Sequence, residues 1–474
     1  MKDKEKDSGG PGKKFRAKSR AEALTRGGPG SAAGRAQEAI NAHPNDPLRQ
    51  MTRFLHDLDL QASNGRVRQV AHRTETSFGR TLKNAIQDLR KVRMPIQRID
   101  QIGRSHAMAL VVYWANELGH SASTIQNKLT NIRKFCDLIG KIGAIPKKEE
   151  LYQELEAKGV DRSALKRHQV THGSKTWRAA GVDASAIIAL MEEENPHEAR
   201  LFELEHCFGL RVNEALSYRP MESERVDGVM VNLGTKGGKG RFVPYLKDPV
   251  KAARQREVQN RARAWAQNHP KGEMGYARMS IEDARTQYYN ELRKYGINKK
   301  NMGVSSHGLR HEFAADYFED ITGHLPPAEG QESSKWFKEN RDLVEHAYKK
   351  VSEALGHWRK DISTAYLSSV SFMSKTQLKR VEKLLEVFQI TPGVTEGLLD
   401  AGVERAWLTG RAAMGVEMAH SERIQLTVTM EQGVELAALV EIQALLEKLL
   451  PGRVQVTPLL LGVQPDEGVE IFLC

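Results

Sequence analysis

The sequence predicts a mainly α-helical protein of several domains, with one small β-hairpin and a small α+β segment at its C-terminal end. Three observations lead to this prediction. The chain of 474 residues is longer than one hydrophobic core usually supports. Apolar residues recur at helical spacing over most of its length. They alternate with polar residues, as in strands, over only a few short stretches.

The chain is basic, and its charge is unevenly distributed. The net charge of +11 suggests a polyanionic partner. The segment from Gly393 to Cys474 contains twelve Asp or Glu and five Lys or Arg, a net charge of −7, so residues 1–392 carry +18. We therefore expect the polyanion-binding part of the chain to end near Pro392.

Cysteine content and hydropathy exclude several classes of protein. Cys136, Cys207 and Cys474 are an odd number of cysteines without paired spacing, which excludes a disulfide framework and a zinc ribbon. No uncharged run in the sequence is long enough to cross a bilayer. We therefore expect a cytoplasmic protein with no membrane partner.

The N-terminal region predicts a basic disordered arm over residues 1–49. Residues 1–36 contain ten Lys or Arg, four Asp or Glu and seven Gly, and very few large hydrophobic residues. Such a segment has too little apolar surface to offset the entropy cost of ordering the chain. The arm is interpreted either as a solubilising tail or as a nonspecific nucleic-acid contact.

Residues 50–170 predict a small helical domain. Two clear helical patterns run through Leu82, Ile86 and Leu89 and through residues 125–139. The sequence places N-caps at Ser105 and Ser123 and helix stops at Gly119 and Gly140. The second helix also carries three basic residues that are candidate contacts to phosphates: Lys128, Arg133 and Lys134.

Residues 175–392 predict a second, larger domain after a polar linker at residues 167–181. The predicted elements are helices at 184–194 and 197–208, strands Val229–Leu233 and Arg241–Leu246 joined by a Gly-rich turn, and further helices to about Ile390. The remaining residues, 393–474, alternate in strand fashion near 424–428 and 454–456 around a helical stretch at 434–450. This last pattern predicts an acidic α+β accessory or oligomerisation module.

The second domain contains the residue types needed to break a phosphodiester bond and keep its energy. That reaction needs a nucleophile, cations for the developing negative charge and an acid for the leaving oxygen. Each candidate taken alone has an ordinary structural explanation, such as an Arg–Glu pair or a packed tyrosine. The candidates are Arg211 with Glu214 one turn later, Lys236 and Lys239 in the glycine-rich turn, His307 and Arg310 three residues apart, His357, and Tyr366 nine residues after it.

The order of these residues resembles the signature of the tyrosine recombinase, or phage integrase, family. That signature is an Arg, a Lys, an HxxR box, a His or Trp, and a Tyr, and Arg211, Lys236, His307, Arg310, His357 and Tyr366 match it once each and in order. The resemblance is strong over residues 175–390. Residues 50–170 resemble more weakly the SAM-like helical core-binding domain of phage integrases. An interval of fifty residues separates His307 from His357, longer than usual in the family, which predicts an insertion around Gly323–Asn340.

The resemblance implies a mechanism without metal or cofactor. Tyr366 would attack a DNA phosphate and form a 3′-phosphotyrosyl intermediate, with Arg211 and Arg310 on the non-bridging oxygens. Lys236, or alternatively Lys239, would protonate the leaving 5′-oxygen. His307 and His357 would bind the phosphate or help to deprotonate the tyrosine. Lys239 also remains a candidate DNA contact.

The resemblance also implies partners and a biological setting. The partners would be double-stranded DNA at specific recombination sites, three further copies of the chain in a homotetramer on two duplexes, and accessory DNA-bending proteins. The chain would act at the nucleoid of a bacterium or derive from a phage, integrating or excising a mobile element. Two alternatives are a type IB topoisomerase-like enzyme that relaxes DNA and a non-catalytic DNA-binding regulator.

The helix after Tyr366 is expected to contribute to assembly. In the family, the element that follows the tyrosine often packs on a neighbouring protomer. The apolar residues of this helix are Leu378, Val381, Leu384, Leu385 and Phe388. We therefore expect them to form a contact between protomers.

Overall fold

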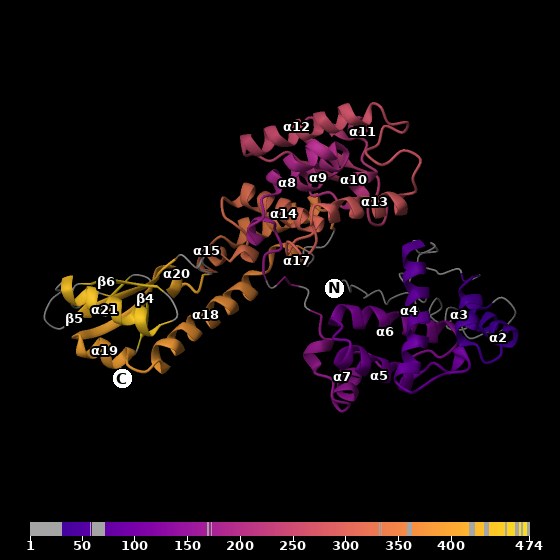
Figure 1. Ribbon diagram of the computed structural model, residues 1–474, viewed down its shortest axis with the longest axis horizontal. Helices are drawn as coiled ribbons and strands as arrows, with labels where there is room; N and C mark the ends of the chain where they lie inside the picture. Colours follow the sequence, from indigo (N-terminus) through magenta and orange to yellow (C-terminus); the bar gives the residue numbers. More distant parts are fainter. Residues whose placement is uncertain are drawn as a thin grey trace, which may run out of the picture. The chain divides into compact units, whose positions relative to one another are not determined.

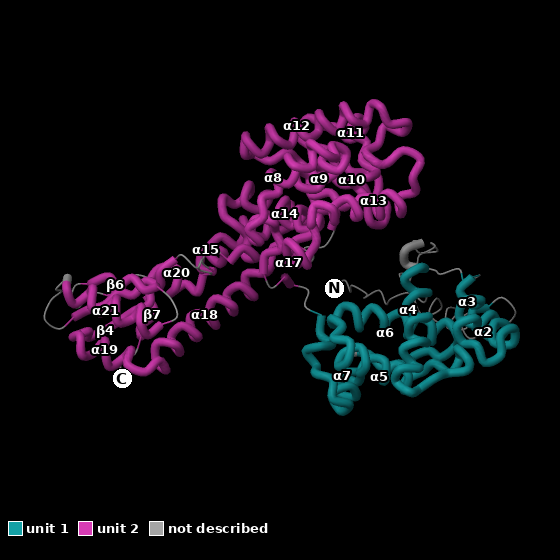
Figure 2. Tube along the Cα trace, viewed as in Figure 1, with its two compact units in different colours: residues 1–168 teal, residues 169–474 magenta. Residues whose placement is uncertain are grey.

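The protein is mainly helical with two small sheets in its described part, which confirms the predicted fold class (Figure 1). The chain forms two compact units, residues 1–168 and 169–474 (Figure 2). No helix in the described ranges is long and apolar enough to span a bilayer. The computed structural model describes residues 31–471 except 57, 59–71, 168–169, 172, 331, 333, 358–362, 417–421, 431–435, 451–452, 460–463 and 466–467.

Unit 1 is a group of helices around its own hydrophobic core. The helices are α2 (Ala32–Ala42), α3 (Pro47–His56), α4 (His72–Lys91), α5 (Arg104–Val112), α6 (Ala122–Leu138) and α7 (Lys148–Glu156). Phe54 and Phe135 meet edge to face in this core, with ring centroids 5.4 Å apart. The buried indole of Trp114 donates a hydrogen bond to Asp88 Oδ2 over 2.9 Å, which gives the one polar atom of this large side chain a partner.

The disordered arm predicted for residues 1–49 is wrong at its C-terminal end. Helix α2 and the start of α3 occupy residues 32–49, and Ala36, Ala39 and Ile40 on α2 are buried. Their small apolar face is sufficient for packing once neighbouring helices cover it, which composition alone does not reveal. The rest of the predicted arm, residues 1–30, lies outside the described residues.

Two predicted helix caps in unit 1 are also wrong. Ser105 and Ser123 lie inside α5 and α6 rather than before them. The N-cap of α6 is Ser121, whose Oγ accepts a hydrogen bond from the Thr124 backbone N–H over 3.4 Å. Each boundary moved by two residues, because several small polar residues compete for the cap and tertiary packing decides between them.

Unit 2 begins with a helical region that contains a three-stranded antiparallel sheet of order β1-β2-β3. Val229 on β2 pairs with Val243 on β3, so the predicted hairpin is present with shorter strands. The elements are α8 (Ala184–Glu194), α9 (Pro196–Phe208), α10 (Val212–Leu216), α11 (Pro220–Ser223), β1 (Glu224–Arg225), β2 (Gly228–Val231), β3 (Arg241–Pro244), α12 (Pro249–Ala266), α13 (Ile281–Lys294), α14 (Ser306–Thr322), α15 (Ser334–Glu339), α16 (Arg341–Ala354), α17 (Thr364–Leu367) and α18 (Val370–Ile390).

Helix α14 lies at the centre of this region. It packs against α9, α16 and α17, and Phe313 and Phe318 on it are fully buried in the shared core. Gly209, which ends α9 at a φ of +58°, faces this helix so closely that a Cβ there would lie 2.5 Å from the Phe313 ring. Only glycine therefore fits at the point where α9 turns toward α10.

The second half of the predicted linker at residues 167–181 is packed on the core rather than free. Trp177 is fully buried. Its backbone N–H donates to Glu312 Oε2 over 2.8 Å, and its indole N–H donates to the Ser305 carbonyl over 2.9 Å. The linker thus fixes both the middle and the beginning of α14.

The C-terminal part of unit 2 contains a mixed sheet of order β6-β5-β4-β7. Strand β4 is antiparallel to β5 and β7, and β5 is parallel to β6, with α21 as the crossover between them. The predicted strands and helix at 424–428, 434–450 and 454–456 correspond to β5, α21 and β6. The elements are α19 (Val394–Asp400), β4 (Val403–Thr409), α20 (Gly410–Ala413), β5 (Ile424–Met430), α21 (Leu436–Leu449), β6 (Val454–Pro458) and β7 (Gly468–Ile471).

Helix α18 joins two hydrophobic cores, and this corrects the expected contact between protomers. Its first turns pack on the core around α14, and Leu384, Leu385 and Phe388 pack on the core of the C-terminal segment (Figure 1). Of the five predicted contact residues, only Leu378 is largely exposed, at 59%. Most of the apolar face is thus covered by the chain's own C-terminal segment, which sequence alone could not distinguish from a second copy.

We predict that Phe388→Ala detaches the C-terminal segment from α18. Phe388 is 1% exposed, and removal of a buried ring leaves a cavity that costs about 3–5 kcal/mol. Denaturant unfolding measures the loss of stability, and limited proteolysis measures the detachment of the C-terminal segment. The control is Leu378→Ala on the exposed side of the same helix, which should cost less than about 0.5 kcal/mol. Equal stability of the two variants would contradict the packing described here.

Candidate active site

Arg211 is the first of the candidate site residues along the chain, and its side chain is held by Glu214. The Glu214 carboxylate accepts from the Arg211 backbone N–H over 2.7 Å and from its guanidinium NH1 over 2.6 Å. The same glutamate therefore caps α10 and orients the arginine side chain, as expected for a carboxylate one turn into a helix. The Arg211 side chain remains partly exposed, at 22%.

Glu214 also binds a second arginine, Arg241, which the sequence analysis missed. Arg241 is 4% exposed on β3; its NH2 donates to Glu214 over 2.8 Å, and its Nε donates to the Ala354 carbonyl over 2.7 Å. Burial alone would raise the pKa of Glu214, but Arg241, Arg310 and Arg211 outweigh it and lower this pKa. The sequence signal that could have identified Arg241 is its position in the β-hairpin, a few residues after the turn lysines.

Arg310 is fully buried beside Tyr366. Its NH1 and NH2 donate to the carbonyls of Gly209 and Leu355, and its Nε donates to the Tyr366 hydroxyl over 3.2 Å. Burial, together with the charges of Arg241 and Arg211, lowers the Arg310 pKa to about 10, so the guanidinium stays positive at neutral pH. A fixed cation thus faces the oxygen of the tyrosine.

Tyr366 is presented by the short helix α17, which is fixed at both ends. The Ser363 Oγ donates to the Tyr348 carbonyl over 3.0 Å, and the Ser368 Oγ donates to the Thr171 carbonyl over 2.8 Å. The tyrosine is 9% exposed. Its hydroxyl lies 3.4 Å from His357 Nε2, so the oxygen is placed between a cation and a nitrogen base.

His357 connects Tyr366 to Arg211. Its Nε2 lies 3.4 Å from Arg211 NH2 as well as from the Tyr366 hydroxyl. Burial and the charges of Arg310, Arg211 and Lys236 lower its pKa to about 3. The imidazole is therefore neutral at pH 7, and because Arg211 can only donate, Nε2 is the ring nitrogen that carries the free lone pair.

His307 and His311 lie on the same side of Tyr366. Their ring centroids are 6.0 Å and 4.6 Å from that of the tyrosine. The pKa of His307 is lowered to about 4, first by burial and then by Arg310 and Arg211. The pKa of His311 is lowered to about 3, mainly by burial. His311 was not among the predicted site residues, although its spacing of four from His307 on a helix was the signal for it.

A cavity of about 660 Å³ opens in front of these side chains. Tyr366, His307 and His357 line it together with two exposed lysines, Lys175 and Lys299. Because both lysines also contribute to the low pKa of His307, the cavity has a positive potential. Neither lysine lies near a predicted motif, so the sequence offered no signal for them.

The two turn lysines differ in their relation to this site. Lys236 and Lys239 are both exposed between β2 and β3. The charge of Lys236 acts on His357 strongly enough to help lower its pKa. Lys236 is therefore the preferred candidate for the proton donor, and Lys239 is the alternative. In the described part of the chain, no group of His, Cys, Asp and Glu is arranged to hold a metal ion.

The three predicted phosphate contacts of unit 1 are half-buried on α6 and engage neighbouring groups. Lys128 Nζ lies 4.4 Å from the centre of the Trp114 ring. Arg133 NH2 donates to the Pro146 carbonyl over 2.7 Å. Lys134 Nζ lies 5.8 Å from the centre of the Phe78 ring. Burial lowers the pKa of each side chain. These contacts give each of the three side chains a structural role on α6, in addition to the predicted contact with phosphate.

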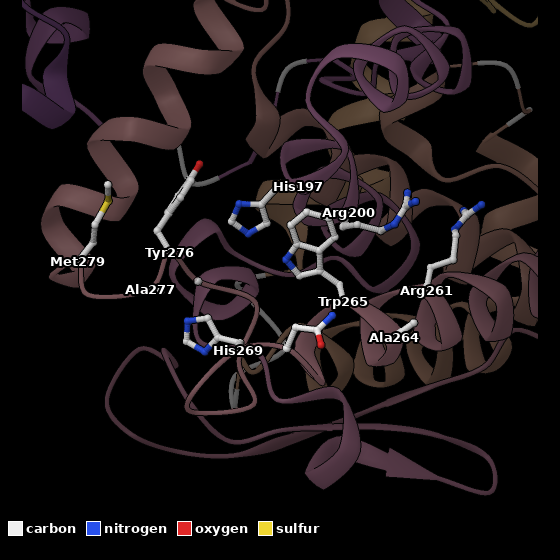
Figure 3. Close-up of a pocket in the computed structure, with 11 residues that line it drawn as sticks. His197, Arg200, Arg261, Ala264, Trp265, His269, Tyr276, Ala277 and Met279 are labelled. Atoms are coloured by element: carbon white, nitrogen blue, oxygen red, sulfur yellow. The ribbon is translucent and has the colours of Figure 1, made fainter.

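A larger hollow of about 760 Å³ lies at the N-terminal end of α9, away from Arg211 at its C-terminal end. His197 stacks on Trp265 there, with centroids 5.1 Å apart, and meets the edge of Tyr276 (Figure 3). His197 Nε2 lies 2.7 Å from the Met274 carbonyl. None of the predicted site residues lines this hollow.

Comparison with known proteins matches one segment of the chain to a protein family. Residues 166–316 match the family described as integrase. This segment contains Arg211, Lys236, His307 and Arg310, and the match confirms the resemblance to the tyrosine recombinase, or phage integrase, family. This match, which covers about a third of the chain, supports a role in site-specific recombination. No curated protein sequence matches the chain.

Several solved structures are similar to the chain at low sequence identity. The Tn1549 transposon integrase in complex with transposon right end DNA is 12% identical with a TM-score of 0.42, covering 74% of this chain and 99% of that chain. A lambda integrase dimer bound to a COC′ core site is 13% identical with a TM-score of 0.41, covering 76% and 86%. A lambda integrase tetramer bound to a Holliday junction is 15% identical with a TM-score of 0.36, covering 70% and 83%.

We predict that Glu214→Gln destabilises the protein by about 3–5 kcal/mol at pH 7, because buried guanidinium groups lose their counter-charge. The folded-state pKa of Glu214 lies below its ordinary value of 4.5. Its stabilisation is therefore present above the unfolded pKa and is lost as the pH falls through the folded pKa. The difference between wild type and variant, measured by denaturant unfolding, should shrink in acid.

The control for this prediction is Glu257→Gln. Glu257 also binds an arginine, Arg261, but its side chain is 62% exposed, so the substitution should cost less than about 1 kcal/mol. A Glu214→Gln variant as stable as this control, or a difference that grows on acidification, would show that Glu214 does not hold the arginine cluster.

Proposed function

We propose that this protein is a site-specific DNA recombinase that cleaves and rejoins DNA strands through a 3′-phosphotyrosyl intermediate at Tyr366. The observation that carries the proposal is the environment of the Tyr366 hydroxyl, 3.2 Å from Arg310 Nε and 3.4 Å from His357 Nε2 at the wall of a positive cavity. A tyrosine buried only for packing would not need a cation and a base at its oxygen.

The nucleophile is activated by these two neighbours. The Arg310 N–H donates to the phenolic oxygen and favours its negative form. Bound phosphate would offset the arginine charges that lower the His357 pKa, and His357 then accepts the phenolic proton at Nε2 as the oxygen attacks the phosphorus. The bond between phosphorus and the 5′-oxygen then breaks, which leaves a 3′-phosphotyrosine and a 5′-hydroxyl. The resemblance to the recombinase family supports the same direction of cleavage.

The arginines supply the charge that the phosphate needs in the transition state. The partly exposed Arg211 contacts His357, which lines the cavity, and Arg310 is fixed behind the tyrosine. Together they hold the two non-bridging oxygens, while His307 donates a hydrogen bond to one of them. Lys236 gives its proton to the leaving 5′-oxygen. No metal or cofactor takes part in this scheme.

The energy of the broken bond is retained in the phosphotyrosine, so a 5′-hydroxyl of a second strand can reverse the step. We therefore propose double-stranded DNA at specific sites as the substrate and a homotetramer on two duplexes as the active assembly. Accessory DNA-bending proteins, a cytoplasmic location at the nucleoid and a role in a mobile element follow from the same family resemblance. The separate helical unit 1 would grip the DNA as the core-binding domain.

We predict that wild-type protein forms a covalent complex with a nicked suicide DNA substrate and that Tyr366→Phe abolishes it, because the ring then lacks the attacking oxygen. Denaturing gels separate the covalent complex from free protein. The substrate sequence is taken from the DNA that flanks the gene, where a direct repeat would mark the ends of an integrated element. The control is Tyr317→Phe, a tyrosine of α14 packed on the same core.

The same experiment distinguishes the alternatives. A covalent complex with Tyr366→Phe would remove the proposed nucleophile, and DNA binding without any covalent complex would favour the non-catalytic regulator. A wild-type enzyme that relaxes supercoiled plasmid but never joins two duplexes would favour the type IB topoisomerase-like alternative.

We predict that Lys236→Ala slows cleavage by about 10²–10⁴-fold, the usual contribution of a general acid. A substrate with sulfur in place of the 5′-bridging oxygen should restore most of the rate, because a thiolate leaves without protonation. Lys239→Ala should cleave both substrates at nearly the wild-type rate. The opposite pattern assigns the proton to Lys239, and rescue of neither variant shows that the acid is another group.

A further inference from the structure

Glu205 is a buried carboxyl group that the proposed mechanism does not use. It lies on α9 and is 1% exposed. Two hydroxyl groups interact with it, that of Tyr288 on α13 and that of Ser306, the first residue of α14. Ser306 immediately precedes His307. The carboxyl group thus lies under the turn that presents His307 to the cavity.

This carboxyl group forms no ion pair with a described residue. Its Oε1 and the Tyr288 hydroxyl are both buried without a hydrogen-bond partner that satisfies ordinary geometry among the described residues. The charged groups that act on Glu205 are Glu214, which repels an anion, and Arg310. Arg310 already donates to Tyr366 and to two carbonyl groups. A carboxylate at this place would be costly, so the neutral acid is the stable form.

The first turn of α14 depends on close contacts around it. The Trp177 indole donates to the Ser305 carbonyl over 2.9 Å. A Cβ at Gly308 would lie 2.9 Å from the Trp177 ring, so the turn is tightly packed against that ring. The turn can therefore move in response to a charge at Glu205 only by breaking these contacts.

We propose that Glu205, as the neutral acid, is a positioning residue that holds the first turn of α14 and with it His307, and that ionisation of Glu205 displaces this turn. The inference rests on the function proposed above. A neutral carboxyl can donate to Tyr288 or Ser306 and accept from the other, whereas a carboxylate can only accept and attracts Arg310. Ionisation therefore weakens the contacts of both His307 and Tyr366.

The proposal predicts a specific pH dependence. Burial raises the pKa of Glu205 to about 8. The groups that face it are Tyr288 from α13, Ser306 and Arg310 from α14, and Glu214 from α10; none of them supplies an unengaged positive charge. In wild type, the neutral form therefore accounts for about nine molecules in ten near pH 7 and about one in ten near pH 9.

The test compares wild type with Glu205→Gln, which keeps a neutral side chain of the same shape at every pH. We expect the ratio of variant to wild-type single-turnover covalent-complex formation to rise about tenfold between about pH 7 and about pH 9. DNA binding should not change. Because the two proteins differ only at residue 205, pH effects on all other groups are common to both and cancel in this ratio.

The matched control is Glu198→Gln on the same helix. Glu198 is also buried, but it accepts a hydrogen bond from Tyr276 over 2.7 Å and lies near the other end of α9. Its ratio to wild type should stay constant across the pH range. A constant ratio for Glu205→Gln as well would overturn the proposal. So would a folded, DNA-binding Glu205→Gln protein that cannot cleave at any pH, since Glu205 would then move a proton itself.

A second measurement does not depend on activity. The folded-state pKa of Glu205 lies above its ordinary value of 4.5, so the fold loses stability from this group as the pH rises from 4.5 toward 8. Denaturant unfolding should show Glu205→Gln gaining stability over wild type through this window and no further above it. If Glu205→Gln gains no stability over wild type in this window, the assignment of a neutral Glu205 is overturned. If wild type forms no covalent complex while this gain is seen, the proposed function fails and the ionisation of Glu205 stands.

Discussion

The site depends on one carboxylate surrounded by three arginines. Glu214 is fully buried and lies 2.6 Å from both Arg211 and Arg241 and 3.8 Å from Arg310. Without it, three guanidinium groups would repel one another at close range in a medium of low dielectric constant. With it, the cluster holds its geometry and still has a net positive charge. That excess charge is what an incoming phosphate would neutralise, so one interaction stabilises the fold and prepares the site for an anion.

Helix α14 links this cluster to the hydrophobic core. Phe313 and Phe318 anchor it among the neighbouring helices, while His307 and Arg310 at its N-terminal end face Tyr366. The backbone carbonyls of Gly209 and Leu355 receive Arg310 from two other elements. The position of the arginine is therefore set by the ends of α9 and α16 as well as by its own helix. Arg310 is held rigidly because the carbonyls that accept its hydrogen bonds lie at the ends of packed helices.

The C-terminal segment gives α18 a role that differs from the one expected. The helix leaves the core around α14 and enters a second core, in which Phe388 is buried among residues of the mixed sheet. The apolar face that could have recruited another copy is largely covered within the chain. The segment is also acidic, with a net charge of −7, so it does not extend the positive surface. Assembly on two duplexes would therefore use other surfaces or require the segment to move.

The sequence by itself determined the helical fold class, the β-hairpin and the family resemblance, because these depend on local periodicity and on short motifs. The spacing of His307 and Arg310 on one helix is an example. Only the tertiary structure decided that Arg211 meets His357, 146 positions away, and that Arg241, His311 and Trp177 support the site. Whether α18 packs on its own chain or on another was also undecided, because an apolar face specifies burial but not the surface that covers it.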